Sequence, residues 1–471
     1  MSRRPARLLG ALLFLAAPFV AEGPASARGI SDARTVVVFV PGMTGTSLRE
    51  RDGRVVWGDG RSLLFPRDSG YATALSFLDP ARDALEPAEV LRELRLFRRW
   101  PIYGPLLDAV EAHGYRIGDL RSPNIDASFF PFAFDWRQDA ARSARELLGQ
   151  LDDLRRERGG AGLEVVLVCQ STGGHICRYL AKYGGASLEE AEAGRAGPPP
   201  WLEVRQMILI GSANGGSLRA LRAIHRGRRY IPTLRIGRRF APETLLSYRG
   251  LVQDLPSYRD GEDNFLDPEG NPISVDVFDP ASWKKYGWSI HSREARERLA
   301  EGRRVDLFGT AEQRDDYLRR VLGDTRRFQE LLRTDAPGFG ATRIHLIHDV
   351  SLDTPDRAVL IPPVDAGAEA SGTDWTTLFT GDRELDRHPV AREKAVALGD
   401  GHSTLTSLLW LSPQELSALV GDPFHVHGGH FDLIYNPVAV SWIIDRLDEP
   451  PPTASSATTP IRRAADATPA R

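Results

Sequence analysis

Apolar residues along this chain gather in short runs with little alternation. Such runs lie at Thr35–Val40, Leu163–Cys169 and Met207–Gly211, and the same pattern resumes at Arg343. A nearly continuous apolar run of this length is typical of a parallel strand buried on both faces. The aromatic stretch Phe129–Trp136 is a further candidate strand.

The segments between these runs carry apolar residues at helical spacing, three or four positions apart. The first helical segment stops at Gly114 and the second at Gly159 and Gly160. Strands that alternate with helices of this length predict an α/β fold with a doubly wound, mostly parallel sheet. The positions that define the helices are Tyr103, Leu106, Leu107 and Val110; Leu147, Leu151 and Leu154; Ile176, Tyr179, Leu180 and Tyr183; and Val440, Ile443, Ile444 and Leu447.

The middle of the chain lacks this regularity. Residues 217–340 are rich in arginine and aromatic residues and are broken by proline and glycine, with helical pieces at Glu297–Gly302 and Asp315–Gly323. An insertion of this length usually carries function or forms a cap over a site. We expect one large domain over residues 28–449 that contains this insertion. Residues 450–471, rich in proline, alanine, threonine and serine, predict a disordered tail.

The N-terminus has the pattern of an export signal. Arginines within the first seven residues precede the apolar run Leu8–Val20, and the small residues Ala25–Ala27 follow it. This pattern predicts a signal peptide over residues 1–27, and hence a protein that is secreted or periplasmic. A membrane anchor is the alternative, but the run is shorter than the roughly 20 residues that a spanning helix needs.

Composition removes one class of partner. A formal net charge of −3, with 26% charged and 42% hydrophobic residues, is ordinary for a globular protein and gives no basic footprint, so we expect no nucleic-acid partner.

The 2 cysteines, Cys169 and Cys177, are too few for a disulfide framework. We interpret them as buried free thiols. A cysteine nucleophile is the alternative, but neither cysteine lies at a turn.

Ser171 lies where the strand Leu163–Cys169 passes into the next helix. A serine on such a sharp turn is exposed at the end of the sheet, and the residues two before and two after it must be small. They are Cys169 and Gly173, in the sequence CQSTG. The serine is therefore a candidate nucleophile. A helix N-cap is the alternative, because serine is favoured there.

A serine nucleophile needs a base, and the base needs an acid that orients it. In α/β-hydrolases the chain order is serine, acid, histidine, which Asp400 and His430 satisfy. Other residues stay open as alternatives, because a GDG acid is often a turn former and clustered histidines can bind metal. The rival acids are Asp353, Asp382 and Asp386, the rival bases are His348 and His402, and the histidines that could bind a metal are His425, His427 and His430.

An oxyanion hole needs two main-chain N–H donors, one after the serine and one from a loop that follows an early strand. Thr172 follows the serine, and the VPGMTG loop offers the N–H of Met43. The same glycine-containing loop lacks the lysine and the spacing of a nucleotide-binding loop. We therefore expect no cofactor and no metal.

Several stretches share their order with one known family: VFVPGMTGTSL, FPFAFDWRQD, VCQSTGGHICRYL, ILIGSANGGS and GDGHSTLTSL, followed by HGGHFDLIYNP. Together they resemble the lecithin:cholesterol acyltransferase family of α/β-hydrolases, over nearly the whole chain after the signal. The resemblance implies an α/β-hydrolase fold in which insertions at about residues 49–100 and 217–340 form membrane-contacting and cap elements. The site residues that it implies are Ser171 as nucleophile, Asp400 as acid, His430 as base, and Met43 and Thr172 as oxyanion donors.

The chain departs from the family pattern after GDG, where His402 and Ser403 replace a hydrophobic or threonine residue and a valine. It also lacks the cysteine pair that closes a lid loop in secreted animal members. The DWR stretch, Asp135–Arg137, matches a family signature, and we interpret it as a hydrogen-bonded structural corner.

These residues favour an exported serine esterase or lipase that acts on lipid esters, either phospholipid or acylglycerol, through an acyl-enzyme, with water or an alcohol as the acceptor. An inactive lipid- or envelope-binding protein of the same fold is the first alternative, and a secreted peptidase is the second. The substrate would be a lipid ester, and the protein would reach it by peripheral contact with a membrane. Apolar clusters that form either this lipid interface or ordinary core are Trp57, Leu63, Leu64 and Phe65, and Phe240, Leu245 and Leu246.

Overall fold

The computed structural model describes most of the chain between Arg34 and Glu449. The described ranges are 34–65, 67–79, 83, 85–95, 99–229, 239–258, 264–363 and 375–449. The expected signal peptide, residues 1–27, and the expected tail, residues 450–471, lie outside them.

A six-stranded parallel sheet forms the centre of the protein. The apolar runs recognised in the sequence are its middle strands, and each strand pairs in parallel with its neighbours. The prediction of a doubly wound, mostly parallel α/β sheet is therefore confirmed. In spatial order the strands are β17 (Phe424–His425), β12 (Arg343–His348), β9 (Leu202–Ile210), β8 (Leu163–Gln170), β1 (Thr35–Val40) and β7 (Phe129–Pro131).

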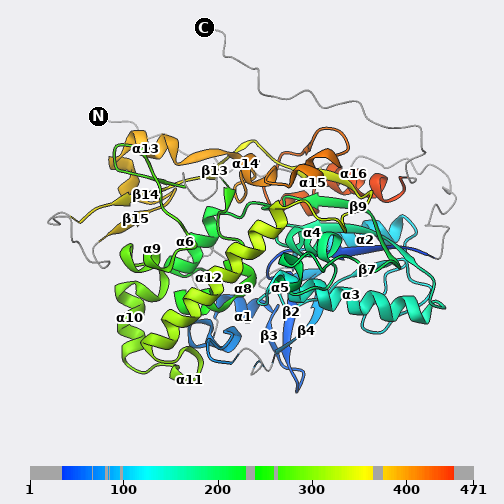
Figure 1. The fold of residues 1–471 in the computed structure, drawn as a ribbon, viewed down its shortest axis with the longest axis horizontal. Coiled ribbons are helices and arrows are strands. Elements are labelled where there is room, and N and C mark those ends of the chain that lie inside the picture. The colour runs from blue at the N-terminus through cyan, green and yellow to red at the C-terminus, as the bar shows by residue number, and fades with distance from the viewer. Residues whose placement is uncertain are drawn as a thin grey trace, which may run out of the picture.

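Both faces of this sheet are buried, which explains why its strands show no alternation. In β1, Val36, Val38 and Val40 contribute to one hydrophobic cluster, and Val37 and Phe39 contribute to another on the opposite face. The first cluster includes residues of α3 (Ala140–Glu157) and α4 (Gly173–Tyr183), and the second includes residues of α2 (Gly104–Ala112) and α16 (Pro437–Leu447). Helices therefore cover the sheet on both sides (Figure 1).

The segment between β9 and β12 is more helical than the sequence suggested. The short piece expected at Asp315–Gly323 belongs to α12 (Ala311–Arg333), a 23-residue helix that begins with a capping box between Thr310 and Gln313. Its buried positions recur at helical spacing, but the arginines on its exposed side hid that periodicity. Together with α6, α9 and α10 it forms much of the left half of the molecule in Figure 1.

The remaining elements form small sheets and short helices around the central layer. The strands are β2 (Thr46–Glu50), β3 (Val55–Trp57), β4 (Leu85–Val90), β5 (Glu93–Arg95), β6 (Arg99–Pro101), β10 (Phe265–Leu266), β11 (Pro272–Ile273), β13 (Leu352–Pro355), β14 (Ala358–Ile361), β15 (Thr376–Leu378) and β16 (Val396–Gly399). The helices are α1 (Gly60–Leu64), α5 (Leu188–Glu192), α6 (Leu218–Arg226), α7 (Pro242–Ser247), α8 (Arg249–Val252), α9 (Pro280–Lys285), α10 (Arg293–Ala300), α11 (Val305–Phe308), α13 (Pro389–Lys394), α14 (Leu405–Leu408) and α15 (Pro413–Ser417).

The apolar clusters considered for a lipid interface are mostly core. The ring of Trp57 lies 4.9 Å from that of Trp136 and 5.9 Å from that of Phe240, and both Trp57 and Phe240 are buried. Leu64, Leu245 and Leu246 are buried as well, and the side chain of Leu63 lies outside the described residues. Phe65 is exposed. The hypothesis that these clusters contact lipid is wrong for the buried residues, because they pack into the main hydrophobic cluster.

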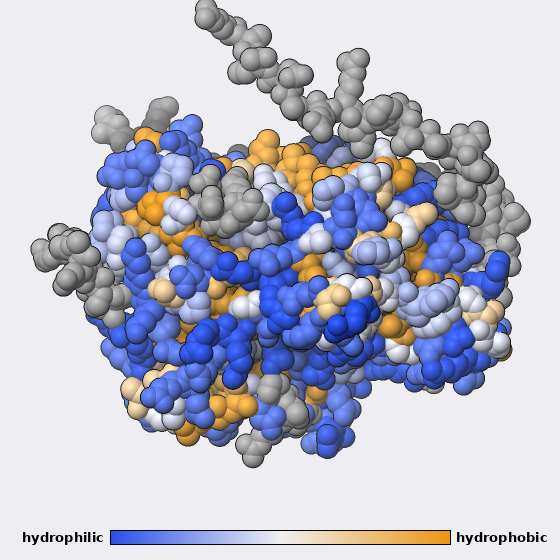
Figure 2. Space-filling view, in the orientation of Figure 1, coloured by the Kyte–Doolittle hydropathy of each residue, from blue (hydrophilic) through white to orange (hydrophobic). Residues whose placement is uncertain are grey.

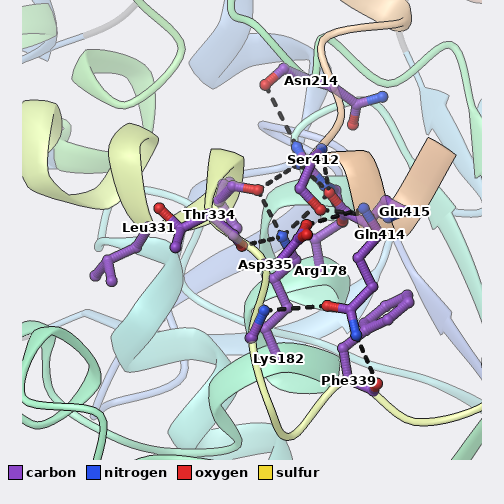
Figure 3. A network of polar contacts seen from close by, with 12 residues as sticks. Arg178, Lys182, Asn214, Leu331, Thr334, Asp335, Phe339, Ser412, Gln414 and Glu415 are labelled. Carbon is purple, nitrogen blue, oxygen red and sulfur yellow. Dashed lines mark hydrogen bonds and ion pairs between the residues drawn. The ribbon is translucent and has the colours of Figure 1, made fainter. Parts of the chain in front are cut away.

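A buried ionic cluster fixes α4 to the rest of the protein. Arg178 donates from Nε and Nη2 to the two carboxylate oxygens of Glu415, at 2.7 Å each, and Lys182 Nζ lies 3.2 Å from Oε2 of the same carboxylate. Lys182 also donates to the main-chain oxygens of Leu332 and Thr334. Figure 3 shows both cations pointing toward Glu415 from one side. The cluster joins α4 to α15 and to the end of α12.

The charge of Glu415 depends on this pairing. Burial opposes ionisation of the carboxyl, but Arg178 and Lys182 outweigh it and lower the pKa of Glu415 to about 2. Burial lowers the pKa of Lys182 to about 8, so Arg178 is the more permanent partner. Because the folded pKa lies below the ordinary value of 4.5, the ion pair stabilises the fold above about pH 4.5. That stability is lost as the pH falls toward 2.

We expect Glu415→Gln to destabilise the protein by about 3–5 kcal/mol at neutral pH, because it leaves two buried cations without their anion. The loss should shrink as the pH falls from about 4.5 toward 2, where the wild-type carboxyl is itself protonated. Urea unfolding at several pH values measures both effects. The control is Glu312→Gln, an exposed position on α12. An unfolding midpoint unchanged from wild type at neutral pH would contradict the ionic account.

Candidate active site

Ser171 sits on a sharp turn between β8 and α4. Its φ of 53° lies in the left-handed region, which is unusual for a residue other than glycine. The turn brings Gly173 so close to β1 that a Cβ there would lie 2.4 Å from the carbonyl oxygen of Val40. The small residue expected two positions after the serine is therefore required by close backbone approach, and the turn directs Ser171 out at the carboxyl end of the sheet.

Cys169 and Cys177 form a disulfide across this turn. The interpretation as free thiols was wrong. Cys169 ends the buried part of β8, Cys177 lies one turn into α4, and their Cα atoms are 6.5 Å apart. Both belong to the hydrophobic cluster on the face of the sheet that α4 covers, so their side chains meet. Sequence analysis judged 2 cysteines too few for a disulfide framework, but a single local bridge between residues 8 apart needs only these two.

The structure brings Ser171, His430 and Asp400 together. His430 Nε2 lies 3.0 Å from Ser171 Oγ, and His430 Nδ1 lies 2.7 Å from Asp400 Oδ2. All three residues are buried, with 3–6% of their surface exposed. Asp400 follows β16 directly, and His430 lies in the loop after β17. With Nδ1 donating to the carboxylate, Nε2 is free to accept the serine proton.

The carboxylate of Asp400 is held in its charged form. Burial would raise its pKa, but His430 and the main-chain N–H groups of His402 and Ser403 outweigh burial and lower it. These N–H groups donate to Oδ1 at 2.8 and 2.7 Å. The main-chain N–H of His430 also donates to the carbonyl oxygen of Asp400, at 2.9 Å. Acid and base are thus fixed by hydrogen bonds of their main chains as well as their side chains.

Gly211, at the end of β9, makes room for this pair. A Cβ at Gly211 would lie 2.9 Å from Leu433 Cδ1, 3.1 Å from Asp400 Oδ2 and 3.2 Å from His430 Nδ1, and its φ of 53° is itself unfavourable for other residues. Sequence reasoning took Gly211 as the end of a strand and missed this function. The signal was present, because a glycine directly after a parallel strand lies at the carboxyl edge, where sites of this fold gather.

Tyr103 orders the loop that carries Met43. Its hydroxyl accepts a hydrogen bond from the main-chain N–H of Gly42 at 3.0 Å and donates to Gln170 Oε1 at 2.9 Å. Within the described part of the chain, the main-chain N–H groups of Met43 and Thr172 have no hydrogen-bond acceptor. Both donors therefore remain available to a ligand. Sequence analysis had assigned Tyr103 to a helix face alone.

The rival site residues lie elsewhere or play other parts. Asp382 pairs with Arg222 and Arg226, and Asp386 pairs with Arg392. Asp353 is exposed on β13, and the His348 ring lies 4.6 Å from that of His425.

Arg137 is fully buried and donates to both carboxylate oxygens of Asp135, as expected for a structural corner. His402 stacks on His430.

The described residues offer neither a clustered metal site nor a membrane-spanning helix. No group of three or more histidine, cysteine, aspartate or glutamate side chains there is arranged to hold a metal ion. No helix in that part of the chain combines the length and apolar character required to span a bilayer.

The chain is similar to several solved structures. One chain of the crystal structure of the Tle4–Tli4 complex is 14% identical, with a TM-score of 0.55, over 87% of this chain and 97% of that chain. Bacillus licheniformis lipase BlEst2 is 11% identical (TM-score 0.28, 90% and 96% covered), and phospholipase PlaB from Legionella pneumophila is 16% identical (TM-score 0.23, 50% and 38% covered).

No family model and no curated protein matches the chain. The resemblance to the lecithin:cholesterol acyltransferase family therefore stays a prediction. The parallel sheet with its covering helices, together with the similarity to the Tle4–Tli4 chain, shows an α/β-hydrolase fold.

We expect Gly211→Ala to slow ester turnover by between about ten- and a hundredfold, because its Cβ would press on the acid and the base and displace them. Steady-state kinetics on a soluble ester measures the effect. The matched control is Gly53→Ala, which has a similar positive φ but nothing within 4 Å of the added Cβ. If Gly211→Ala turns the ester over no more slowly than Gly53→Ala, crowding of the acid and the base is not the cause and the interpretation of Gly211 fails.

Proposed function

We propose that this protein is a serine ester hydrolase that works through an acyl-enzyme. The observation that carries the proposal is the continuous relay from Ser171 Oγ through His430 to Asp400, with distances of 3.0 and 2.7 Å. The relay ends at the carboxyl edge of a parallel sheet, where α/β folds place their sites. An inactive binding protein would have no need of a buried, fully hydrogen-bonded relay.

The geometry supports a two-step reaction. Ser171 Oγ forms a bond to the ester carbonyl carbon while His430 Nε2 takes the hydroxyl proton, and the N–H groups of Met43 and Thr172 donate to the carbonyl oxygen as it becomes an oxyanion. The bond to the leaving alcohol then breaks, and His430 returns the proton to that alcohol. Water, or a second alcohol, attacks the acyl-serine in the same manner and frees Ser171. Asp400 stabilises the imidazolium in both steps.

We propose lipid esters as the substrate class. Leu352 and Phe431 support it, since they expose 40% and 61% of their surface beside the relay. The Phe431 ring lies 5.4 Å from that of His430, and Leu352 Cδ1 lies 3.1 Å from where a Cβ of Gly429 would stand. Figure 2 shows hydrophobic residues gathered along the upper edge of the molecule, over the region of β13 and α14. Apolar side chains exposed at the entrance of a site favour an apolar substrate.

We also propose that the protein acts outside the cytoplasm. The N-terminal residues 1–27 carry the pattern of an export signal. The disulfide between Cys169 and Cys177 supports this location, because disulfides persist mainly in oxidising compartments.

We expect Ser171→Ala to lower ester turnover by at least about a thousandfold and to abolish labelling by a fluorophosphonate, without loss of the folded state. Products formed from phosphatidylcholine vesicles that contain a long-chain alcohol are identified by mass spectrometry. Free fatty acid identifies hydrolysis, and new esters identify acyl transfer. The control is Ser417→Ala, an exposed serine on α15.

The proposal of a hydrolase fails if the wild-type protein is not labelled, or if Ser171→Ala keeps its turnover. Vesicle binding by an unlabelled wild type would identify a binding protein instead.

A second prediction concerns the substrate class. Leu352→Ser and Phe431→Ser should lower the ratio of the rate on vesicles to the rate on a short soluble ester by about tenfold, because each removes an apolar side chain worth about 1.5–3 kcal/mol when buried in lipid. The matched control is Ile125→Ser, with 58% of its surface exposed. A ratio that stays at the wild-type value in both variants would exclude lipid contact at these residues.

A further inference from the structure

His402 contacts both the acid and the base of the site. Its main-chain N–H donates to Asp400 Oδ1 at 2.8 Å, and its imidazole stacks on that of His430, with ring centroids 4.5 Å apart and planes 24° from parallel. The residue lies where the chain departs from the family pattern that its GDG segment resembles. A flat ring placed in this way restricts the tilt of His430, and its π face lies against the imidazole that receives the proton.

The far edge of His402 meets a buried carboxyl group. Asp254 Oδ2 lies 3.9 Å from His402 Nε2, and Asp254 exposes 2% of its surface. Its other oxygen, Oδ1, is buried and has no hydrogen-bond partner within the described part of the chain. A buried, unpartnered carboxyl oxygen is unfavourable unless the group serves a purpose there. Asp254 lies beside a titratable ring that stacks on His430.

Main-chain contacts lock this pair in place. Ser217 donates from its main-chain N–H to the carbonyl oxygen of Asp254 at 2.8 Å, and from Oγ to the carbonyl oxygen of His402 at 2.6 Å. Ser217 caps α6 and Asp254 follows α8, so both belong to the segment between β9 and β12. The insertion thus reaches the base of the relay through His402.

Burial disfavours the charged form of both groups. It raises the pKa of Asp254 well above its ordinary value, and it lowers the pKa of His402 well below, where the nearby His430, Arg219 and Arg228 lower it further. A neutral ring stacked on His430 does not repel the proton that His430 accepts from Ser171. Its π face attracts that charge. The attraction of a cation to an aromatic face within about 6 Å changes an equilibrium constant by roughly two- to thirtyfold.

We propose that His402 is a positioning residue for His430, held in its stacked orientation by Asp254, and that its ring stabilises the imidazolium formed when His430 takes the proton of Ser171. This inference rests on the proposed hydrolase function. It assigns a role to a residue outside the relay and explains why a carboxyl group is buried beside it.

The test compares His402→Ala, which removes the ring, with His402→Phe, which keeps a flat ring, on a soluble ester. We expect His402→Ala to lower kcat about tenfold or more with KM within about twofold of wild type, and to slow fluorophosphonate labelling equally. His402→Phe should retain kcat within about threefold. The matched control is His427→Ala, a histidine close to His430 in sequence whose side chain is 90% exposed.

Asp254 supplies a second, independent pair of variants. Asp254→Ala should lower kcat, as His402→Ala does. Asp254→Asn, which has nearly the shape of a protonated carboxyl, should keep kcat close to the wild-type value. This pair tests the inference even if His402→Ala fails to fold. Thermal unfolding of each variant separates an effect on the relay from a loss of the fold.

An unchanged kcat in His402→Ala would overturn the inference, and so would a His402→Phe variant as slow as His402→Ala. A loss in Asp254→Asn as large as in Asp254→Ala would overturn the part assigned to Asp254. Failure of the hydrolase proposal looks different, because the wild-type protein itself would then not react with the fluorophosphonate.

Discussion

Ser171 turns the chain from β8 into α4 within two residues, and the surrounding structure is shaped to hold that turn. Gly173 lies directly against the carbonyl oxygen of Val40, so any larger residue there would push α4 away from β1. The disulfide between Cys169 and Cys177 closes the turn covalently. At the next residue after Cys177, the buried pairing of Arg178 with Glu415 fixes α4 to α15. A strained backbone persists only where neighbouring contacts over-determine it, and here three independent kinds of contact do so.

The relay that faces this serine comes from late, separate parts of the chain. Asp400 and His430 follow β16 and β17, and Gly211 at the end of β9 lets them lie against the sheet. Their position therefore depends on the strands beneath them and on His402 beside them. Ser217 donates a hydrogen bond to the main chain of His402, so a shift of the segment that carries Ser217 would displace the ring beside His430. Ser217 and Asp254, in the segment between β9 and β12, thus contact His402 and, through it, the base of the site.

Sequence reasoning predicted what local patterns determine. Buried parallel strands leave continuous apolar runs, and a serine on a sharp turn requires small neighbours, so the sheet and the position of Ser171 were both visible in the sequence. Contacts between distant residues were not: Tyr103 meets Gln170, and Asp254 meets His402, only after the chain has folded. The location of residues such as Trp57 could not be predicted, because a cluster of apolar residues has the same sequence pattern in a core and at a lipid interface. The long helix α12 was recognised only in part, because arginines on its exposed side interrupt the apolar pattern.

The central claim is that Ser171 is the nucleophile of an ester hydrolase whose oxyanion hole is formed by the main-chain N–H groups of Met43 and Thr172. A crystal structure of the protein after reaction with a phosphonate ester tests it most directly, because the phosphonyl oxygen mimics the oxyanion. The account predicts a covalent bond from Ser171 Oγ to phosphorus, with the phosphonyl oxygen about 2.7–3.1 Å from both nitrogens. An adduct on another residue, or a phosphonyl oxygen directed away from those N–H groups, would contradict it.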